Sequence, residues 1–317
     1  MLRRLALRWI ARGYEVADSI ERRSARLAVV GSGGDPDSMR DFAVIAHRGA
    51  SADAPENTLP AFREALLQGA REIELDVQLS RDGEVFVFHD ASLAAKTGAR
   101  GAVRDHAAAR LRELEIGGWF DASHPGRSER FAGTRLATLA EVLAEFGERL
   151  RYQIELKAPD AELPQRALAV IDRHGLRAHV TLTSFHSDAL ARARALDADV
   201  ATCALVRTPR LLRAEAIQRG ESRGLRAGAL LRRAIETAVD GAFDGVALAA
   251  PYLEPRIVDF TRSRGLRLRA WRVRSEADLD QAVDAGAEAA TVDWPGRARA
   301  HLSQRRSGRG KAARSAR

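Results

Sequence analysis

Between Ile45 and Asp90 the chain reads Ile45-Ala46-His47-Arg48-Gly49, then Pro55-Glu56-Asn57-Thr58, then Glu72-Ile73-Glu74-Leu75-Asp76-Val77, and then Val85-Phe86-Val87-Phe88-His89-Asp90. Three short apolar runs thus end in two histidines, one arginine and two carboxylates. This set of side chains suits phosphoryl chemistry. A cation can hold the phosphate, carboxylates can hold a metal, and imidazoles can move protons.

Around this stretch, short β-branched runs alternate with Ala/Leu/Arg-rich helical segments. The predicted strands are Ala43–Ala46, Glu72–Val77, Val85–Phe88, Tyr152–Leu156, Val180–Thr183, Val200–Leu205, Gly245–Ala249, Leu266–Val273 and Ala289–Val292. The predicted helices are Leu59–Gln68, Leu139–Phe146, Leu163–His174, Asp188–Leu196, Ile257–Arg264 and Glu276–Ala285. About eight βα units imply a closed parallel sheet, the (β/α)8 TIM barrel.

The barrel is expected to occupy residues 39–302, with an insertion at about 98–135, after the third strand, over its mouth. Residues 1–38 are expected to form an extra N-terminal element, with a basic amphipathic helix over 2–28 followed by a Gly-rich linker. That helix either packs on the barrel or on a second subunit, or lies on an anionic membrane. Residues 303–317 contain five Arg, one Lys and no acid, and we expect a disordered basic tail there.

The strongly basic sequence pI of about 10.5 comes from the ends of the chain. Residues 1–40 carry a net +3 and residues 303–317 a net +6, so the remainder of the total of +8 is −1 for residues 41–302. A nucleic-acid-binding domain carries positive charge on its folded surface. We therefore expect no specific nucleic-acid partner.

Cys203 is the only cysteine, which excludes an intrachain disulfide and a cysteine-based zinc cluster. No run approaches the roughly 18 apolar residues of a membrane-spanning helix, and the N-terminus lacks the apolar core of a secretory signal. These features predict a cytoplasmic protein, with peripheral membrane contact through residues 2–28 as the alternative. The oligomeric state is left open.

In a TIM barrel the active site lies at the carboxyl ends of the strands. Side chains two apart in a strand share a face, so Glu74 with Asp76, and Glu155 with Lys157, should reach the same rim. The other residues expected there are His47, Arg48 and His89. Three carboxylates without thiols favour Mg²⁺ or Ca²⁺ as the cofactor.

Each of these residues also has an ordinary structural interpretation. A lone carboxylate at a strand end is usually solvated or paired with a cation. Asn57-Thr58 before a helical pattern is typical of a helix start, with one of the two as the N-cap. The functional interpretation therefore depends on the co-occurrence of the whole set.

Residues 43–300 resemble the glycerophosphodiester phosphodiesterase family. The resemblance includes the motifs quoted above and Ile154-Glu155-Leu156-Lys157, Ser184-Phe185, Trp271 and Asp293-Trp294-Pro295. It implies a barrel fold, one divalent cation, and cleavage of glycerophosphodiesters to glycerol 3-phosphate and an alcohol. Matched motif by motif, it implies that Glu74, Asp76 and Glu155 bind the metal and that His47 and His89 are the acid–base pair. By the same match, Arg48 and Lys157 contact phosphate or substrate, and Trp271 lines the pocket.

The chain departs from the family pattern at Ala137-Thr138-Leu139, Gln153, Arg272 and Val292. None of these removes a proposed ligand or acid–base residue, but Arg272 is near the expected pocket wall and could alter substrate choice. Two rival functions stay open: a membrane-associated (lyso)phospholipase of the same superfamily, and a non-catalytic phosphodiester- or membrane-binding protein whose pocket the insertion blocks. The attacking group is either water or the glycerol 2-hydroxyl.

One local problem also stays open. Only about eight residues separate the second predicted strand from the third, too few for a crossover helix. A plain hairpin between the two strands would send His89 to the wrong end of the barrel. Either the link is an unusually short crossover or the strand limits are wrong.

Overall fold

A computed structural model describes residues 42–124, 130–157, 160–220 and 226–315, without the side chains after residue 307. The predicted helix at 2–28 and its linker lie outside the described residues. Within these ranges, no helix is long and apolar enough to span a bilayer.

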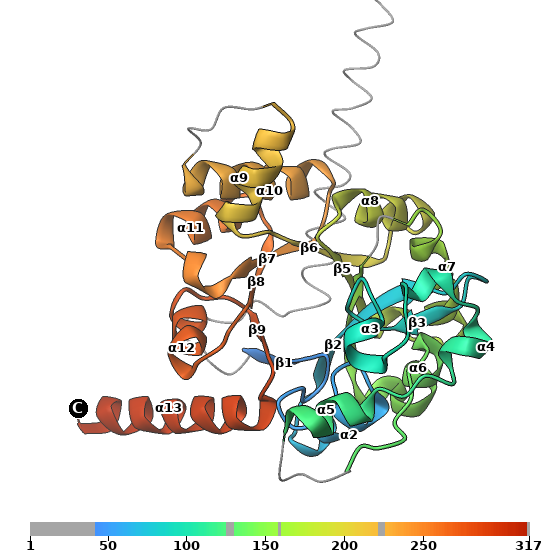
Figure 1. The fold of residues 1–317 in the computed structure, drawn as a ribbon. Helices are drawn as coiled ribbons and strands as arrows, with labels where there is room; N and C mark the ends of the chain where they lie inside the picture. The colour runs from blue at the N-terminus through green and yellow to red at the C-terminus, as the bar shows by residue number, and fades with distance from the viewer. Residues whose placement is uncertain (1–41, 125–129, 158–159, 221–225, 316–317) are drawn as a thin grey trace, which may run out of the picture. The chain divides into compact units, whose positions relative to one another are not determined.

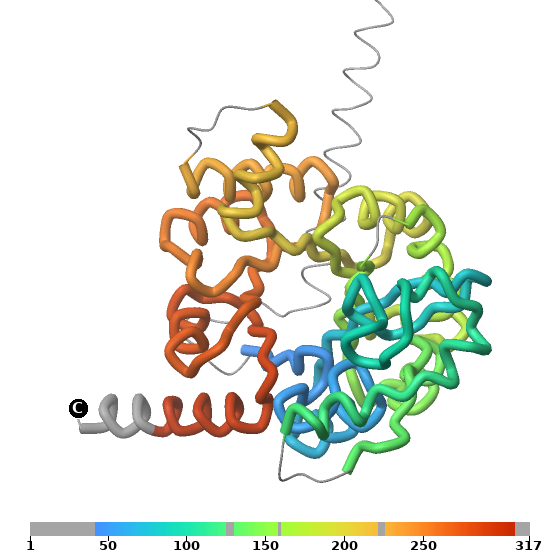
Figure 2. The backbone as a smooth tube through the Cα atoms, viewed as in Figure 1, coloured from blue at the N-terminus to red at the C-terminus, as the bar shows by residue number. Residues whose placement is uncertain are grey.

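Eight parallel strands close into a barrel, with helices around the outside of the ring (Figures 1 and 2). The strands are β1 (Ala43–His47), β2 (Glu72–Leu79), β4 (Arg151–Leu156), β5 (Val180–Ser184), β6 (Ala201–Leu205), β7 (Gly245–Ala249), β8 (Arg267–Trp271) and β9 (Ala289–Val292). β1 pairs with β9 on one side and with β2 on the other, which closes the ring. The predicted (β/α)8 TIM barrel is confirmed.

The helices that cover the barrel begin at polar or proline positions and bury one apolar face. They are α2 (Leu59–Leu67), α6 (Leu139–Phe146), α7 (Leu163–Arg173), α8 (Ser187–Leu196), α9 (Pro209–Gln218), α10 (Ala227–Asp240), α11 (Pro255–Ser263), α12 (Glu276–Asp284) and α13 (Pro295–Ser315). Thr58, Thr138 and Ser275 are N-caps whose hydroxyls accept a backbone N–H three residues on. Short 3₁₀ turns are found at Gly147–Arg149, Arg177–His179 and Ala250–Tyr252.

Successive side chains of β2 point alternately to the hydrophobic core and to the inside of the barrel, where the candidate site lies. Ile73, Leu75 and Val77 are fully buried in the main hydrophobic core under the helices. Glu74 and Asp76 are on the other face of the pleat, inside the barrel. The same alternation in β4 buries Ile154 in the core, and it brings Glu155 to the interior.

The third predicted strand is not a barrel strand. β3 (Val85–Val87) pairs antiparallel with the far end of β2, whose last residues extend beyond the ends of β1 and β4. The chain therefore continues beyond the rim of the barrel and turns at Gly83 (φ 84°). It then returns until the Phe88 N–H donates to Asp76 O at 2.9 Å. The hairpin thus places His89 at the rim. Because β2 continues to Leu79, the predicted end of this strand at Val77 was wrong.

The insertion packs beside the hairpin. After α3 (Ala94–Thr97) it forms a 3₁₀ turn (Val103–Asp105), α4 (Ala108–Leu111) and α5 (Gly117–Ser123). Its apolar residues form a second core with Phe86 and Phe88 and a third around Phe120, which packs on Ala61 of α2. No described residue of 98–135 lines the central cavity, so the predicted cover over the mouth is not seen there.

The C-terminal segment also differs from expectation. α13 continues to Ser315, where we predicted a disordered tail from residue 303. Arg305 explains the start of this continuation, because its guanidinium pairs with Asp280 at 2.7 Å and also contacts Asp284 on α12.

Candidate active site

Three carboxylates meet at the rim of β2 and β4. Asp76 is directly opposite Glu155 in the sheet, and Glu74 is two residues before Asp76 on the same face. Oxygen atoms of the three side chains lie within 4.8 Å of one another, and all three residues are buried. Such a cluster is unfavourable without a positive partner, because like charges repel strongly where water is excluded.

The pKa values of the three carboxylates shift in different directions. Burial, and then the charges of its neighbours Asp76 and Glu155, raise the pKa of Glu74 well above its usual value. Burial and the Asp76 charge raise the pKa of Glu155 to about 7. Burial also acts to raise the pKa of Asp76, but Arg48 and Lys157 outweigh it and hold that pKa below its usual value. Asp76 is therefore the member that stays ionised.

Two cations hold this cluster. Lys157 Nζ is 2.9 Å from Glu155 Oε1 and 3.4 Å from Asp76 Oδ1, and the charges of these acids raise the Lys157 pKa against the opposing effect of burial. Arg48 Nε is 3.2 Å from Asp76 Oδ2, and the Arg48 backbone N–H donates to Glu74 Oε2 at 3.1 Å. Both cations line the cavity above the carboxylates.

The turn after β1 has an unusual backbone. Arg48 has φ 56° and Gly49 has φ 87°, in the left-handed region that side chains disfavour. A Cβ on Gly49 would lie 2.6 Å from the carbonyl carbon of Ala61. Gly49 is therefore required for α2 to approach the turn that carries His47 and Arg48.

His47 is oriented by a residue near the other end of the chain, which follows the neighbouring strand of the barrel. Its Nδ1 donates to Asp293 Oδ1 at 2.6 Å, and its Nε2 is 4.0 Å from Glu74 Oε2. Asp293 follows β9 and also accepts from Ser51 Oγ at 3.1 Å. Burial acts to raise the Asp293 pKa, but the bond from His47 outweighs it and keeps the carboxylate ionised. The imidazole is thereby fixed with Nε2 toward the cavity.

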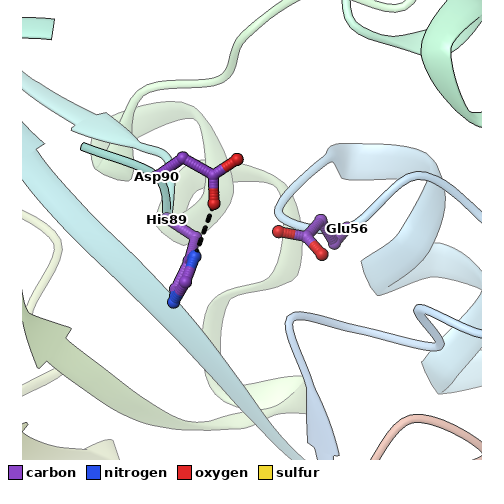
Figure 3. A group of neighbouring side chains, drawn as sticks. All are labelled: Glu56, His89 and Asp90. Carbon is purple, nitrogen blue, oxygen red and sulfur yellow. Dashed lines mark hydrogen bonds and ion pairs between the residues drawn. The ribbon is translucent and has the colours of Figure 1, made fainter. Parts of the chain in front are cut away.

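His89 has a similar arrangement within the hairpin. Figure 3 shows its Nδ1 bonded to Asp90 Oδ1, at 2.7 Å, with the Glu56 carboxylate pointing toward the pair. Burial, helped by Arg48 and Lys157, lowers the His89 pKa despite the Asp76 charge. His89 is thus held as a neutral imidazole beside the carboxylate cluster.

Glu56, His89 and Asp90 are also close enough to hold a cation, but a side chain of the protein already fills that role. Lys96 Nζ is 2.6 Å from Glu56 Oε1 and 3.0 Å from Asp90 Oδ2. Glu56 in turn accepts from Arg48 Nη1 at 2.8 Å. Lys96 thus links Asp90, which binds His89, to Glu56, which binds Arg48.

Asn57 has a role that the sequence did not reveal. Its Nδ2 donates to Asp76 Oδ2 at 2.8 Å, and its Oδ1 accepts the Asp76 backbone N–H at 3.2 Å. We predicted a helix start here, and Thr58 is indeed the N-cap of α2. Asn57 is instead a positioning residue for a carboxylate, at φ 59°.

All eight predicted site residues meet at one place. A cavity of about 500 Å³ is lined by seven of them: His47, Arg48, Glu74, His89, Glu155, Lys157 and Trp271. Asp76 lies beneath it, with no exposed surface. Trp271 ends β8 and packs edge-to-face on Phe185, with ring centroids 5.4 Å apart. The sequence analysis missed Asp293, Asn57, Glu56 and Lys96 as partners of these residues. The motifs Pro55-Glu56-Asn57-Thr58 and Asp293-Trp294-Pro295 contain three of them, but no role at the site was assigned to these three residues.

The model of the glycerophosphoryl diester phosphodiesterase family matches residues 47–297. A glycerophosphodiester phosphodiesterase of Bacillus subtilis is 31% identical over 260 residues, which cover 79% of this chain and 83% of the relative.

Solved structures show the same fold. One is a phosphodiesterase of Oleispira antarctica in complex with the product sn-glycerol 3-phosphate (TM-score 0.66, 24% identity, 82% of this chain and 96% of that one). Another is a glycerophosphodiester phosphodiesterase of Agrobacterium tumefaciens (TM-score 0.65, 23% identity, 82% and 99%). The chain belongs to the glycerophosphoryl diester phosphodiesterase family and is a phosphoric diester hydrolase.

Proposed function

We propose that this protein hydrolyses glycerophosphodiesters to glycerol 3-phosphate and an alcohol, in phospholipid and glycerol metabolism, with the help of one divalent cation. The observation that carries this proposal is the cavity at the barrel rim. It combines three buried carboxylates with two imidazoles that are each oriented by a carboxylate, and with Arg48 and Lys157. Family membership and the name of the Bacillus relative support the same reaction.

The three carboxylates fit a hard divalent cation. They supply only oxygen ligands, as Mg²⁺ and Ca²⁺ prefer, and Asp76 Oδ1 has no hydrogen-bond partner within the described ranges although it is buried. Glu74, Asp76 and Glu155 would hold the ion. When bound, it would neutralise phosphate charge and act as a Lewis acid.

The two histidines then account for proton transfer. One imidazole accepts the proton of the attacking hydroxyl, which belongs to water or to the glycerol 2-hydroxyl. The other protonates the oxygen of the leaving alcohol when its bond to phosphorus breaks. If the 2-hydroxyl attacks, this step gives a cyclic phosphate, and water then opens the ring to release glycerol 3-phosphate. Asp293 and Asp90 fix each ring by its Nδ1, so that Nε2 is the reacting nitrogen. Arg48 and Lys157 hold the phosphate oxygens.

The alternative of a blocked, non-catalytic pocket is not favoured, because no described residue of the insertion lines the cavity. The test is release of glycerol 3-phosphate from glycerophosphocholine, glycerophosphoethanolamine and glycerophosphoglycerol. With Mg²⁺ or Ca²⁺ present, wild type should be active, whereas His47→Asn and His89→Asn should each lose at least about 100-fold in kcat, as expected for general acid–base residues. Histidine variants as active as wild type would refute the assigned roles.

A further inference from the structure

Two arginines follow the end of strand β8 at the rim of the cavity. Arg272 and Arg274 lie one and three residues after Trp271, both are exposed, and both line the catalytic cavity. Within the described ranges, neither guanidinium has an ion pair or hydrogen bond. The Arg274 backbone N–H donates to Asp278 Oδ2 at 2.9 Å, and that carboxylate also caps α12 through the Ser275 N–H. No nearby acid is thus committed to these two side chains.

The backbone holds both arginines at the rim. Val273, between them, is buried in the main core, which anchors the turn. Arg272 has φ 57°, in the region that favours glycine. Such strain in a long side-chain residue is typical of positions kept for function. The turn therefore presents two guanidinium groups at the cavity, one on each side of a buried anchor.

The cavity lining carries more cationic than anionic side chains. Its described lining includes five Arg or Lys side chains and three Asp or Glu side chains. Arg48 and Lys157 are engaged by the carboxylate cluster, and Asp293 is held by His47. Within the described residues, Arg272 and Arg274 therefore add positive charge without an ion pair on the β8 side of the cavity.

We propose that Arg272 and Arg274 form a subsite for a second anionic group, a phosphate carried by the alcohol part of the diester. This inference rests on the proposed function. With the scissile phosphate held at Arg48 and Lys157, the alcohol extends along Trp271 to the two arginines. Guanidinium groups bind phosphate oxygens through paired, charge-assisted hydrogen bonds. The same charges disfavour a cationic alcohol such as choline.

The test compares two diesters that differ by one glycerophosphate group, which carries the second phosphate. Glycerophosphoglycerol has none, and bis(glycerophospho)glycerol has one. Initial rates of glycerol 3-phosphate release give kcat/KM for each. We expect wild type to prefer the bis-phosphodiester by about tenfold, mainly through KM, and the preference to shrink at high salt because the arginines are exposed.

The double variant Arg272→Gln/Arg274→Gln should reduce that preference to about twofold, the factor that the two equivalent ends of the bis-phosphodiester give by themselves. The matched control is Arg256→Gln, an exposed arginine on α11 outside the cavity lining, which should retain the full preference. Thermal unfolding of each variant checks that it is folded.

A wild-type preference of about twofold or less, or a larger preference that the double variant retains, would overturn the subsite while leaving the proposed function intact. Release from neither diester by wild type, with Mg²⁺ or Ca²⁺ present, would overturn both.

Discussion

At the scale of single residues, the raised pKa of Glu155 makes stability depend on pH. In the metal-free protein, burial and the Asp76 charge raise this pKa from 4.5 to about 7. Between these values the folded protein keeps a proton that the unfolded chain has released. The stabilisation is complete below pH 4.5 and is lost as pH rises through 7.

Glu155→Gln removes this titration. In EDTA, the melting temperature of the variant relative to wild type should therefore rise from pH 5 to pH 8, by an amount that corresponds to about 1–3 kcal/mol. Mg²⁺ or Ca²⁺ should stabilise wild type more at pH 8 than at pH 5.5, because the ligands must be deprotonated. A difference in melting temperature that does not change with pH would contradict the raised pKa.

At the scale of elements, His89 follows the β2–β3 hairpin, and Lys96 on α3 holds the carboxylate of Asp90 that orients it. The Lys96 side chain is only 8% exposed and is the shared counter-ion of Glu56 and Asp90. Lys96→Met should cost about 1–3 kcal/mol in the free energy of unfolding, because it removes a shared cation from two part-buried carboxylates and leaves Glu56 with Arg48 alone. It should also lower kcat, whereas Lys96→Arg should restore most of both. Urea unfolding and kinetics measure these effects, and a Met variant with wild-type stability and kcat would refute the link.

The turn between β1 and α2 depends on Gly49. Gly49→Ala adds a Cβ at positive φ and within 2.7 Å of Ala61, so we expect a loss of about 2 kcal/mol or more in stability, together with reduced activity. Gly98→Ala is the control, because Gly98 also has positive φ but would meet nothing within 4 Å. It should cost about 1 kcal/mol from backbone strain alone. Equal losses in the two variants would show that the close packing of α2 does not matter.

At the scale of the whole molecule, local sequence patterns located the strands and therefore the site. The positions of Glu74, Asp76, Glu155 and Lys157 followed from strand alternation, because side chains two apart share a face. What failed was the pairing of β3: periodicity shows that a segment is extended, but not which strand it meets or in which direction.

The sequence analysis missed the partners of the site residues for a related reason. Asp293 is 246 residues from the histidine that it orients, and only closure of the barrel brings the two together. Asn57 binds Asp76 through a left-handed backbone conformation, whereas its sequence context is an ordinary helix start. Local patterns can report neither long-range closure nor a single unusual dihedral angle.

The central claim is that the carboxylate cluster holds a cation required for phosphodiester hydrolysis. Its most direct test is the rate of glycerol 3-phosphate release from glycerophosphoglycerol, with Mg²⁺, Ca²⁺ or EDTA, for wild type, Glu74→Gln and Glu72→Gln. Glu72 is on the same strand and face but outside the cluster. Wild type and Glu72→Gln should release product only when the ion is present, and Glu74→Gln should be inactive throughout. Release that persists in EDTA, or an active Glu74→Gln, would contradict the account.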